Sequence, residues 1–236
     1  MSKPNDTTGQ TIKLDQHYWA ERWQQGDTGW HQPDGSPTLR QNWLSLQLAA
    51  NAVMLVPFCG KTPDMLWLAA QGHHVVGVEV ARQAIDEFFD DNRLSFRQWQ
   101  ADDGIHYCAD YQQGRIEIVE GDVLALSDDT LKRCQAVYDR GALVAQTLSQ
   151  RQAYYQAVYG RLAVGCKALL LTVDYPQHQK MGPPFAVGQA EVTHHLGQHW
   201  QIVLQSLEDM LPANPGYQQA GVDYAHSLTM LLEKVF

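Results

Sequence analysis

A glycine-containing turn follows the first apolar, β-branched run of the chain. Residues 52–57 read AVMLVP, and the next residues, FCGKT, lead into a segment with helical spacing. Ligands of open α/β sheets bind at the carboxyl ends of strands, and Gly60 permits a positive φ and close approach of a ligand. A phosphate-binding loop is excluded, because Leu55 replaces a required glycine and Pro57 lacks an N–H. Only one glycine of a dinucleotide fingerprint is present, so the turn indicates a different ligand.

Acidic residues end the next two predicted strands. Glu79 ends the run VVGVEV, where its carboxylate can accept hydrogen bonds from the hydroxyls of a ribose. The alternative is an ordinary solvated glutamate. Asp122 follows Gly121 after the run IEIV, where the side chain and the next backbone N–H can address the edge of an adenine ring. The alternative for Asp122 is a helix cap or an Asx turn.

An acid, a base and a glycine follow one another at the end of the fourth predicted strand, AVYDRGAL. Asp139 and Arg140 can be a surface ion pair, which would contribute little. The Gly-Ala turn after them would instead hold Arg140 over the ligand crevice. A guanidinium there can bind a carboxylate or an anionic nucleophile through two parallel hydrogen bonds.

A proline-rich loop, MGPPF at residues 181–185, follows the fifth predicted strand. Two prolines restrict the loop at low entropic cost and present Phe185. Such a stiff, aromatic loop can form the wall of a pocket for a flat heterocycle, whereas the alternative is a plain rigid turn.

Neither the histidines nor the cysteines form a convincing metal site. His195 and His199 are four residues apart, but no acid completes an H-E-x-x-H pattern, which favours a solvated helix face. The four cysteines are widely scattered and are expected to be reduced, mostly buried thiols. We therefore expect no metal.

The periodicity around these residues predicts a doubly wound α/β fold of seven mostly parallel strands with a C-terminal antiparallel hairpin. Helices are expected at 62–71, 81–90 and 150–162. A turn-rich stretch at 212–221 is expected to separate the two strands of the hairpin. The expected strands are 52–57, 74–80, 115–119, 136–139, 168–173, 200–208 and 226–235.

Four of the seven tryptophans precede the sheet, in a segment too polar for a core strand: Trp19, Trp23, Trp30 and Trp43. The segment is predicted to be a helical flap that packs its indoles on the sheet edge, a lid over a ligand, or both. We expect one domain over 1–236, with an N-terminal lid at 1–47 and a Rossmann-like core at 48–236.

Charge and hydropathy exclude several classes of partner. The 236 residues carry a formal net charge of -9 and no basic stripe, which disfavours nucleic acid. The N-terminus is polar, and no run of eighteen apolar residues occurs. We expect a cytoplasmic protein that binds neither nucleic acid nor a membrane.

Together these segments resemble the thiopurine S-methyltransferase family. The resemblance lies in residues 57–61 (PFCGK), 77–80 (GVEV), 139–145 (DRGALVA) and 182–185 (GPPF), and extends to residues 19–23 (WAERW) and 28–31 (TGWH). It covers the chain from about residue 15 to the C-terminus. It implies a class I methyltransferase fold and S-adenosylmethionine as cofactor, with S-adenosylhomocysteine as product.

The resemblance also implies the site residues. Phe58 replaces the leucine common in the family, and Trp30 stands where the family often has a phenylalanine facing the substrate. The acceptor would be bound by Trp30, Pro183, Pro184 and Phe185. The cofactor would be bound by Trp23, Phe58, Glu79, Asp122, Val123 and Arg140.

The implied reaction is an in-line methyl transfer to a thiolate, which needs little acid or base chemistry because a thiol ionises near neutral pH. Arg140 would stabilise the anionic sulfur or the cofactor carboxylate. Asp139 would orient Arg140, or, as a weaker hypothesis, act as a base. Three alternatives stay open: methyl transfer to a small thiol, methyl transfer to a selenium or tellurium species, and a non-catalytic adenosylmethionine or nucleotide sensor. A monomer acting on a small thiol or thiopurine-like substrate is expected.

Overall fold

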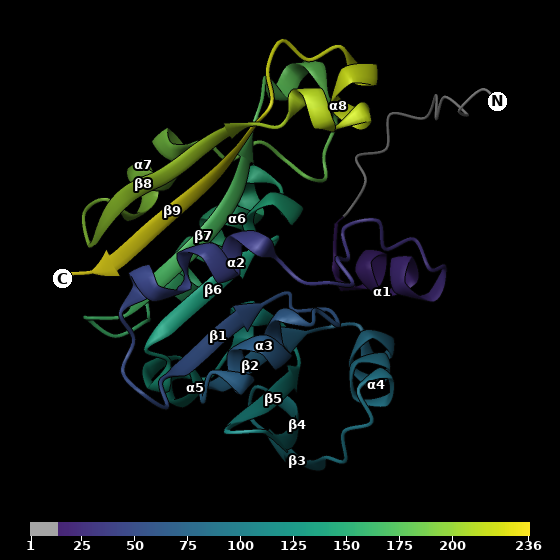
Figure 1. Cartoon of the computed structure of the whole chain (residues 1–236), viewed down its shortest axis with the longest axis vertical. Helices are drawn as coiled ribbons and strands as arrows, with labels where there is room; N and C mark the ends of the chain where they lie inside the picture. Colours follow the sequence, from purple (N-terminus) through teal and green to yellow (C-terminus); the bar gives the residue numbers. More distant parts are fainter. Residues whose placement is uncertain (1–13) are drawn as a thin grey trace.

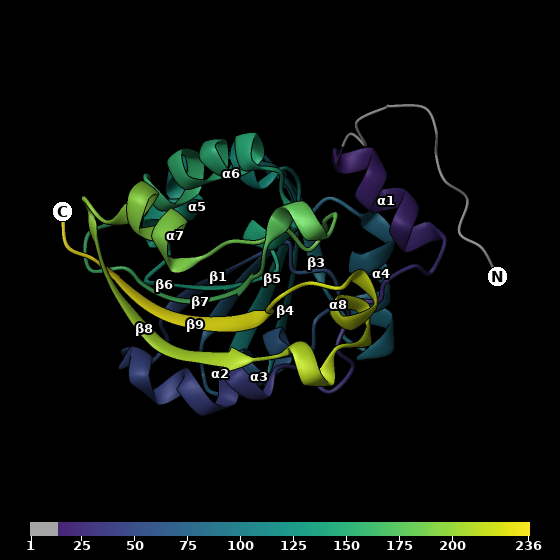
Figure 2. The same cartoon turned by 90° about the horizontal axis from the view of Figure 1, so that it is seen from above.

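Five parallel strands form the centre of a sheet that helices cover on both faces (Figure 1, Figure 2). The computed structural model describes residues 14–236. The parallel strands are β1 (Val53–Pro57), β2 (His74–Glu79), β5 (Gly114–Glu120), β6 (Ala136–Arg140) and β7 (Lys167–Asp174). They lie in the order β5-β2-β1-β6-β7, so the direction of winding reverses between β1 and β6. The predicted parallel strands are confirmed.

The parallel strands are apolar because both of their faces are buried. Along β1, Met54 and Val56 contribute to the core on one face and Leu55 to the core on the other. Figure 2 shows the two helical layers, with α5 to α7 above the sheet and α2 and α3 below it.

The helices of the first layer pack around Leu55. They are α5 (Asp128–Arg133), α6 (Leu148–Tyr154), the π-helical turn η4 (Tyr155–Tyr159) and α7 (Gln189–Leu196). A capping box between Thr147 and Gln150 starts α6. The predicted helix at 150–162 therefore begins earlier, at Leu148, and changes to π-helical geometry after Tyr154.

The helices of the second layer pack around Met54 and Val56. The layer contains α2 (Pro37–Asn42), η1 (Trp43–Leu46), α3 (Asp64–Ala70) and α4 (Arg82–Asp91). In α4 the buried residues Ala84, Ile85 and Phe88 follow helical spacing. The helices predicted at 62–71 and 81–90 are confirmed as α3 and α4.

The C-terminal strands are antiparallel, as predicted. β9 (His226–Lys234) lies between β7 and β8 (Trp200–Asp209). The turn-rich stretch between them contains the short helices η6 (Leu211–Ala213) and α8 (Pro215–Ala220). Three further short helices are η2 (Val123–Ala125), η3 (Leu143–Ala145) and η5 (Gln177–Gln179).

The predicted number of strands was too low. The part of the chain that the structure describes contains the seven predicted strands and two more, β3 (Arg97–Ala101) and β4 (Gly104–Tyr111), which extend the sheet beyond β5. β3 escapes prediction because four of its five residues are exposed. β4 escapes prediction because a histidine, His106, is buried in it, which interrupts the apolar pattern of the strand.

The N-terminal segment divides into two parts. α2 and η1 belong to the core, where Leu39 and Leu46 are buried. α1 (Gln16–Gln24) lies apart from this layer, against α4 (Figure 1). Residues 37–46 of the segment expected as a lid therefore belong to the core layer, and residues 1–13 lie outside the described range.

Two further observations concern the expected environment of the protein. No helix within residues 14–236 is long and apolar enough to cross a membrane. All four cysteines are free and buried, as predicted.

Candidate active site

The turn of residues 58–61 lies at the carboxyl end of β1, where the strand order reverses; the carboxyl ends of β1 and β6, where ligands of open α/β sheets bind, are called the crevice below. Gly60 has φ +51°, and a Cβ added there would lie 2.8 Å from Cζ2 of Trp23. The indole of Trp23 therefore rests directly on the glycine. Phe58 also has a positive φ, of 50°, which is uncommon for a bulky residue and typical of functional loops. Both Trp23 and Phe58 thus reach the predicted cofactor edge.

Glu79 lies beside this turn and is bound by backbone amides. Its Oε2 accepts a hydrogen bond from the N–H of Gly60 (2.8 Å), and its Oε1 accepts from the N–H groups of Val80 (2.9 Å) and Ala81 (2.8 Å). Burial raises the pKa of the carboxyl, and the three amides oppose this effect. A carboxylate has about four acceptor positions, so a further hydrogen bond from a ligand hydroxyl can still be accepted.

Asp122 and Val123 follow β5 at the same edge of the sheet. The Asp122 Oδ1 accepts from the N–H of Leu124 (2.9 Å) and so caps η2, which was the alternative interpretation of this residue. The Val123 side chain is buried in the core, so only its backbone is available to a ligand.

Arg140, the last residue of β6, reaches the N-terminal segment. Its guanidinium donates to the carbonyl of Trp30 over 3.3 Å, which connects β6 to residues 110 positions earlier. Trp30 is 38% exposed, and its ring makes edge contacts with Trp19 (5.4 Å) and Trp23 (6.1 Å between centroids). Arg22 lies over the Trp30 ring at 5.4 Å. Trp19, Trp23 and Trp30 thus form one aromatic cluster that meets Arg140 through Trp30.

Asp139 has a different environment from Arg140, because adjacent strand residues point to opposite faces. The carboxylate is fully buried, and its Oδ2 accepts from the hydroxyls of Tyr154 (2.8 Å) and Tyr159 (3.1 Å). Its Oδ1 has no hydrogen-bond partner within residues 14–236. Burial raises the pKa of Asp139 to about 6, against the opposing effect of the two tyrosines and nearby amides. Among residues 14–236, no hydrogen bond or ion pair joins Asp139 to Arg140.

The proline-rich loop is attached to the crevice by backbone contacts. The N–H of Phe185 donates to the carbonyl of Val144 (2.6 Å), and the hydroxyl of Tyr175 donates to the carbonyl of Pro184 (2.7 Å). A Cβ at Gly182 would lie 2.6 Å from the Phe185 ring, so the ring folds back over the loop. The loop containing Pro183, Pro184 and Phe185 is therefore held next to the segment after Arg140.

Comparison with known proteins now decides the family. A family model described as thiopurine S-methyltransferase (TPMT) matches residues 14–235. The chain belongs to the thiopurine S-methyltransferase family. The resemblance predicted from the sequence is confirmed, and with it the enzyme class, an S-adenosylmethionine-dependent methyltransferase.

Two relatives illustrate the extent of the similarity to this family. A thiopurine S-methyltransferase of Xanthomonas campestris pv. campestris (strain 8004) is 46% identical over 209 residues, which cover 89% of this chain and 94% of the relative. A thiopurine S-methyltransferase of Bordetella pertussis (strain Tohama I) is 42% identical over 222 residues, which cover 94% of this chain and 100% of the relative.

Solved methyltransferase structures share the fold of this family member. The 1,6-didemethyltoxoflavin-N1-methyltransferase of Burkholderia thailandensis, solved with S-adenosylhomocysteine, has a TM-score of 0.61 and 15% identity, covering 100% of this chain and 94% of that chain. The N-methyltransferase NodS of Bradyrhizobium japonicum WM9, also solved with S-adenosylhomocysteine, has a TM-score of 0.61 and 15% identity, covering 93% and 98%. The predicted methyltransferase fold is confirmed.

Asp139 and the turn after β1 have partners that the sequence did not single out. Tyr154 and Tyr159 bind Asp139, although helical spacing alone gave no sign that they would meet it. Lys61 pairs with Glu87 (2.8 Å) and Asp91 (3.0 Å) on α4, which ties the turn to this helix and agrees with rejecting a phosphate-binding role.

His31 is a further residue of this region without an assigned role. Burial, together with the charges of Lys61 and Arg140, lowers its pKa. The residue lies within the TGWH segment that carries part of the family resemblance, so its presence was visible in the sequence but its cationic surroundings were not.

Proposed function

We propose that this enzyme transfers a methyl group from S-adenosylmethionine to an anionic sulfur acceptor, such as a thiopurine-like or small thiol. The proposal rests mainly on one observation. The contact between Arg140 and Trp30 brings the family's DRGA segment next to the aromatic N-terminal segment. A fixed cation beside an aromatic wall suits a flat or soft anion.

The residues at the carboxyl edge fit S-adenosylmethionine. In this proposal, Glu79 accepts from a ribose hydroxyl, because its carboxylate is already oriented by three amides. The backbone at Asp122 and Val123 would bind the adenine edge. Trp23 and Phe58 would supply apolar contact on either side of the turn.

The bound cofactor supplies an electrophilic methyl group on a positively charged sulfur. Arg140 has guanidinium donors to spare, since it makes a single hydrogen bond among residues 14–236. We assign to it the binding of the cofactor carboxylate or of the acceptor anion. A charge fixed before the reaction lowers the barrier without reorganisation.

The acceptor would lie between the two aromatic elements. Trp30 forms one side in this proposal, and Pro183, Pro184 and Phe185 form the other. The hydrogen bond from Phe185 to Val144 supports the second wall, because it fixes the loop close to the segment that follows Arg140. Such walls exclude water, so that the methyl group meets the bound nucleophile.

Asp139 is proposed as a positioning residue that shapes the end of β6 from within the core. Its complete burial argues against direct removal of a proton from the acceptor. A thiolate acceptor needs no such base near neutral pH.

The wider setting of the reaction is also a proposal. We propose a single-domain, cytoplasmic monomer that requires no metal and binds neither nucleic acid nor a membrane. The net charge of -9 supports a small-molecule substrate over nucleic acid.

The decisive experiment is transfer of a radiolabelled methyl group to a panel of acceptors. The panel contains a thiopurine, small thiols, and selenium and tellurium oxyanions, and calorimetry measures S-adenosylhomocysteine binding in parallel. Labelled thioether supports the proposal, and labelled selenium or tellurium products would assign the second acceptor class. Binding without transfer to any acceptor would favour a sensor, and absence of binding would overturn the proposal.

A further inference from the structure

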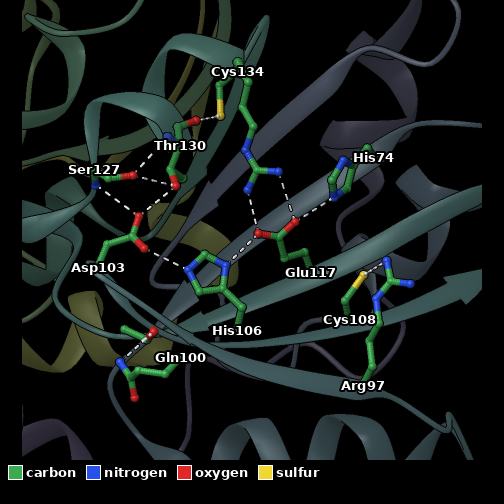
Figure 3. Close-up of polar contacts among 12 residues, drawn as sticks. His74, Arg97, Gln100, Asp103, His106, Cys108, Glu117, Ser127, Thr130 and Cys134 are labelled. Atoms are coloured by element: carbon green, nitrogen blue, oxygen red, sulfur yellow. Dashed lines mark hydrogen bonds and ion pairs between the residues drawn. The ribbon is translucent and has the colours of Figure 1, made fainter.

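A buried network of charged residues lies beside the proposed adenine subsite, outside the residues assigned to the cofactor. Its central members are Asp103, in the turn between β3 and β4, His106 on β4 and Glu117 on β5, all at least 95% buried. Figure 3 shows them as a continuous chain of polar contacts that reaches Ser127 and Thr130 at one end and His74 at the other.

The geometry around His106 requires a protonated imidazole. Nδ1 lies 2.7 Å from Glu117 Oε1, and Nε2 lies 2.8 Å from Asp103 Oδ1. A neutral imidazole has one N–H and cannot donate to both carboxylates. Burial opposes protonation, but the hydrogen bonds to the two carboxylates outweigh it and raise the pKa of His106. Asp103 is therefore held from one side by a cation.

The other side of Asp103 holds the segment that follows β5. Its Oδ2 accepts from the N–H of Ser127 (3.0 Å) and from the hydroxyl of Thr130 (2.7 Å). The backbone of the same residue meets the start of that segment, because a Cβ added at Gly121 would lie 2.4 Å from the Asp103 carbonyl oxygen. One residue thus contacts both ends of residues 121–127.

Asp122 and Val123, the residues proposed to address adenine, lie between these two anchor points. η2 contains only three residues, so the conformation of 121–127 depends on what holds its ends. A carboxylate fixed between a cation and two donors is suited to this purpose, since interactions that orient binding groups contribute to affinity.

We propose that Asp103, locked by protonated His106, is a positioning residue that holds residues 121–127 in the conformation that binds the adenine end of S-adenosylmethionine. The inference rests on the proposed function. It adds a residue from the β3–β4 hairpin, which lies outside the seven predicted strands, to the determinants of cofactor affinity.

The test is Asp103→Asn, which preserves shape but leaves one acceptor oxygen, too few to serve His106 on one side and Ser127 and Thr130 on the other. We expect the Kd for S-adenosylhomocysteine, measured by calorimetry, and the KM for S-adenosylmethionine to rise about tenfold. The kcat at saturating cofactor should change less than about threefold, because the groups around the reacting sulfur are untouched.

His74→Gln is the matched control, because His74 contacts Glu117 (3.0 Å) at the far end of the network and does not touch residues 121–127. It should leave Kd unchanged. Thr130→Val is a milder variant in case Asp103→Asn does not fold, and it should raise Kd in the same direction by about threefold.

The outcomes separate the two proposals. A wild-type protein that does not bind S-adenosylhomocysteine would overturn the proposed function. A wild-type protein that binds, with equal Kd in Asp103→Asn or in a folded Thr130→Val, would overturn the positioning role alone. An equal loss of affinity in His74→Gln would likewise overturn it, because the network would then act through overall stability.

Discussion

The crevice at the carboxyl ends of β1 and β6 and the Asp103–His106–Glu117 network use their charges in opposite ways. In the network, every carboxylate oxygen accepts at least one hydrogen bond from a side chain or an amide. In the crevice, the side chain of Arg140 donates to a single carbonyl, over 3.3 Å, among residues 14–236. Saturated buried polar groups hold a structure in place, whereas unused capacity is what a ligand can occupy.

The same contrast separates the two aromatic environments. Trp99 stacks on His106 with 5.1 Å between ring centroids and so covers a network that is already complete. Trp30 is exposed to a similar extent (38%, against 39% for Trp99), makes edge contacts with other indoles and lies beside Arg140, which has donors to spare. The two rings are therefore equally exposed, and the two regions differ in polar saturation, which is complete around His106 and incomplete around Arg140.

The largest effect is expected in the network, from Glu117→Gln. The substitution leaves the buried, protonated His106 with Asp103 as its remaining carboxylate and removes the partner of the partly buried Arg133, so the free energy of unfolding should fall by about 3–5 kcal/mol. Denaturant unfolding measures the change. Asp110→Asn, which breaks an exposed ion pair with Arg115 on the same hairpin, serves as control and should cost less than about 1 kcal/mol. Equal stability of the two variants would show that the network stabilises the protein no more than an exposed ion pair does.

At the crevice, Arg140→Ala should instead affect activity while stability stays near that of the wild type. We expect kcat/KM to fall by about 10²–10³, the usual cost of removing a donor that stabilises developing or bound charge. Arg140→Lys should recover only part of the activity, because a point charge replaces the planar fork. Arg115→Ala controls for loss of a cation, and wild-type activity in Arg140→Ala would exclude the proposed role.

The contribution of Asp139 to the free energy of unfolding is expected to depend on pH. Its pKa is about 6 in the folded protein, above its ordinary value, so the folded state binds the proton more tightly than the unfolded state. Its contribution to stability is therefore present below the ordinary pKa and is lost as pH rises through about 6. The stability of the wild type relative to Asp139→Asn should fall by about 3 kcal/mol between about pH 3 and 8. Parallel stability profiles for the two proteins would contradict this expectation.

The smallest expected change is in cofactor affinity on removing Glu79. Glu79→Ala should weaken S-adenosylhomocysteine binding by about 2–3 kcal/mol, because it removes a charge-assisted hydrogen bond. It also leaves the amides of Gly60, Val80 and Ala81 without their acceptor, so some loss of stability should accompany it. Calorimetry on the folded fraction separates the two effects, with Glu208→Ala on β8 as control. Unchanged affinity would remove Glu79 from the site.

The candidate site residues could be placed at one edge of the sheet from the sequence because strand ends are local features. Pro57, Glu79 and Arg140 each end an apolar run, and parallel strands joined by crossovers present these ends on one side. The same reasoning located β8 and β9. It missed β3, which is almost entirely exposed, and β4, where burial of His106 depends on carboxylates from other segments.

By itself, the sequence determined the parallel sheet, the C-terminal antiparallel strands and the family, since apolar periodicity and short motifs depend on neighbouring residues. Only the tertiary structure decided that Trp23 rests on Gly60, that Tyr154 and Tyr159 bind Asp139, and that Asp103 reaches Ser127. Each of these contacts joins residues far apart in the chain or on different elements. Their formation depends on how whole elements pack, and no local pattern contains that information.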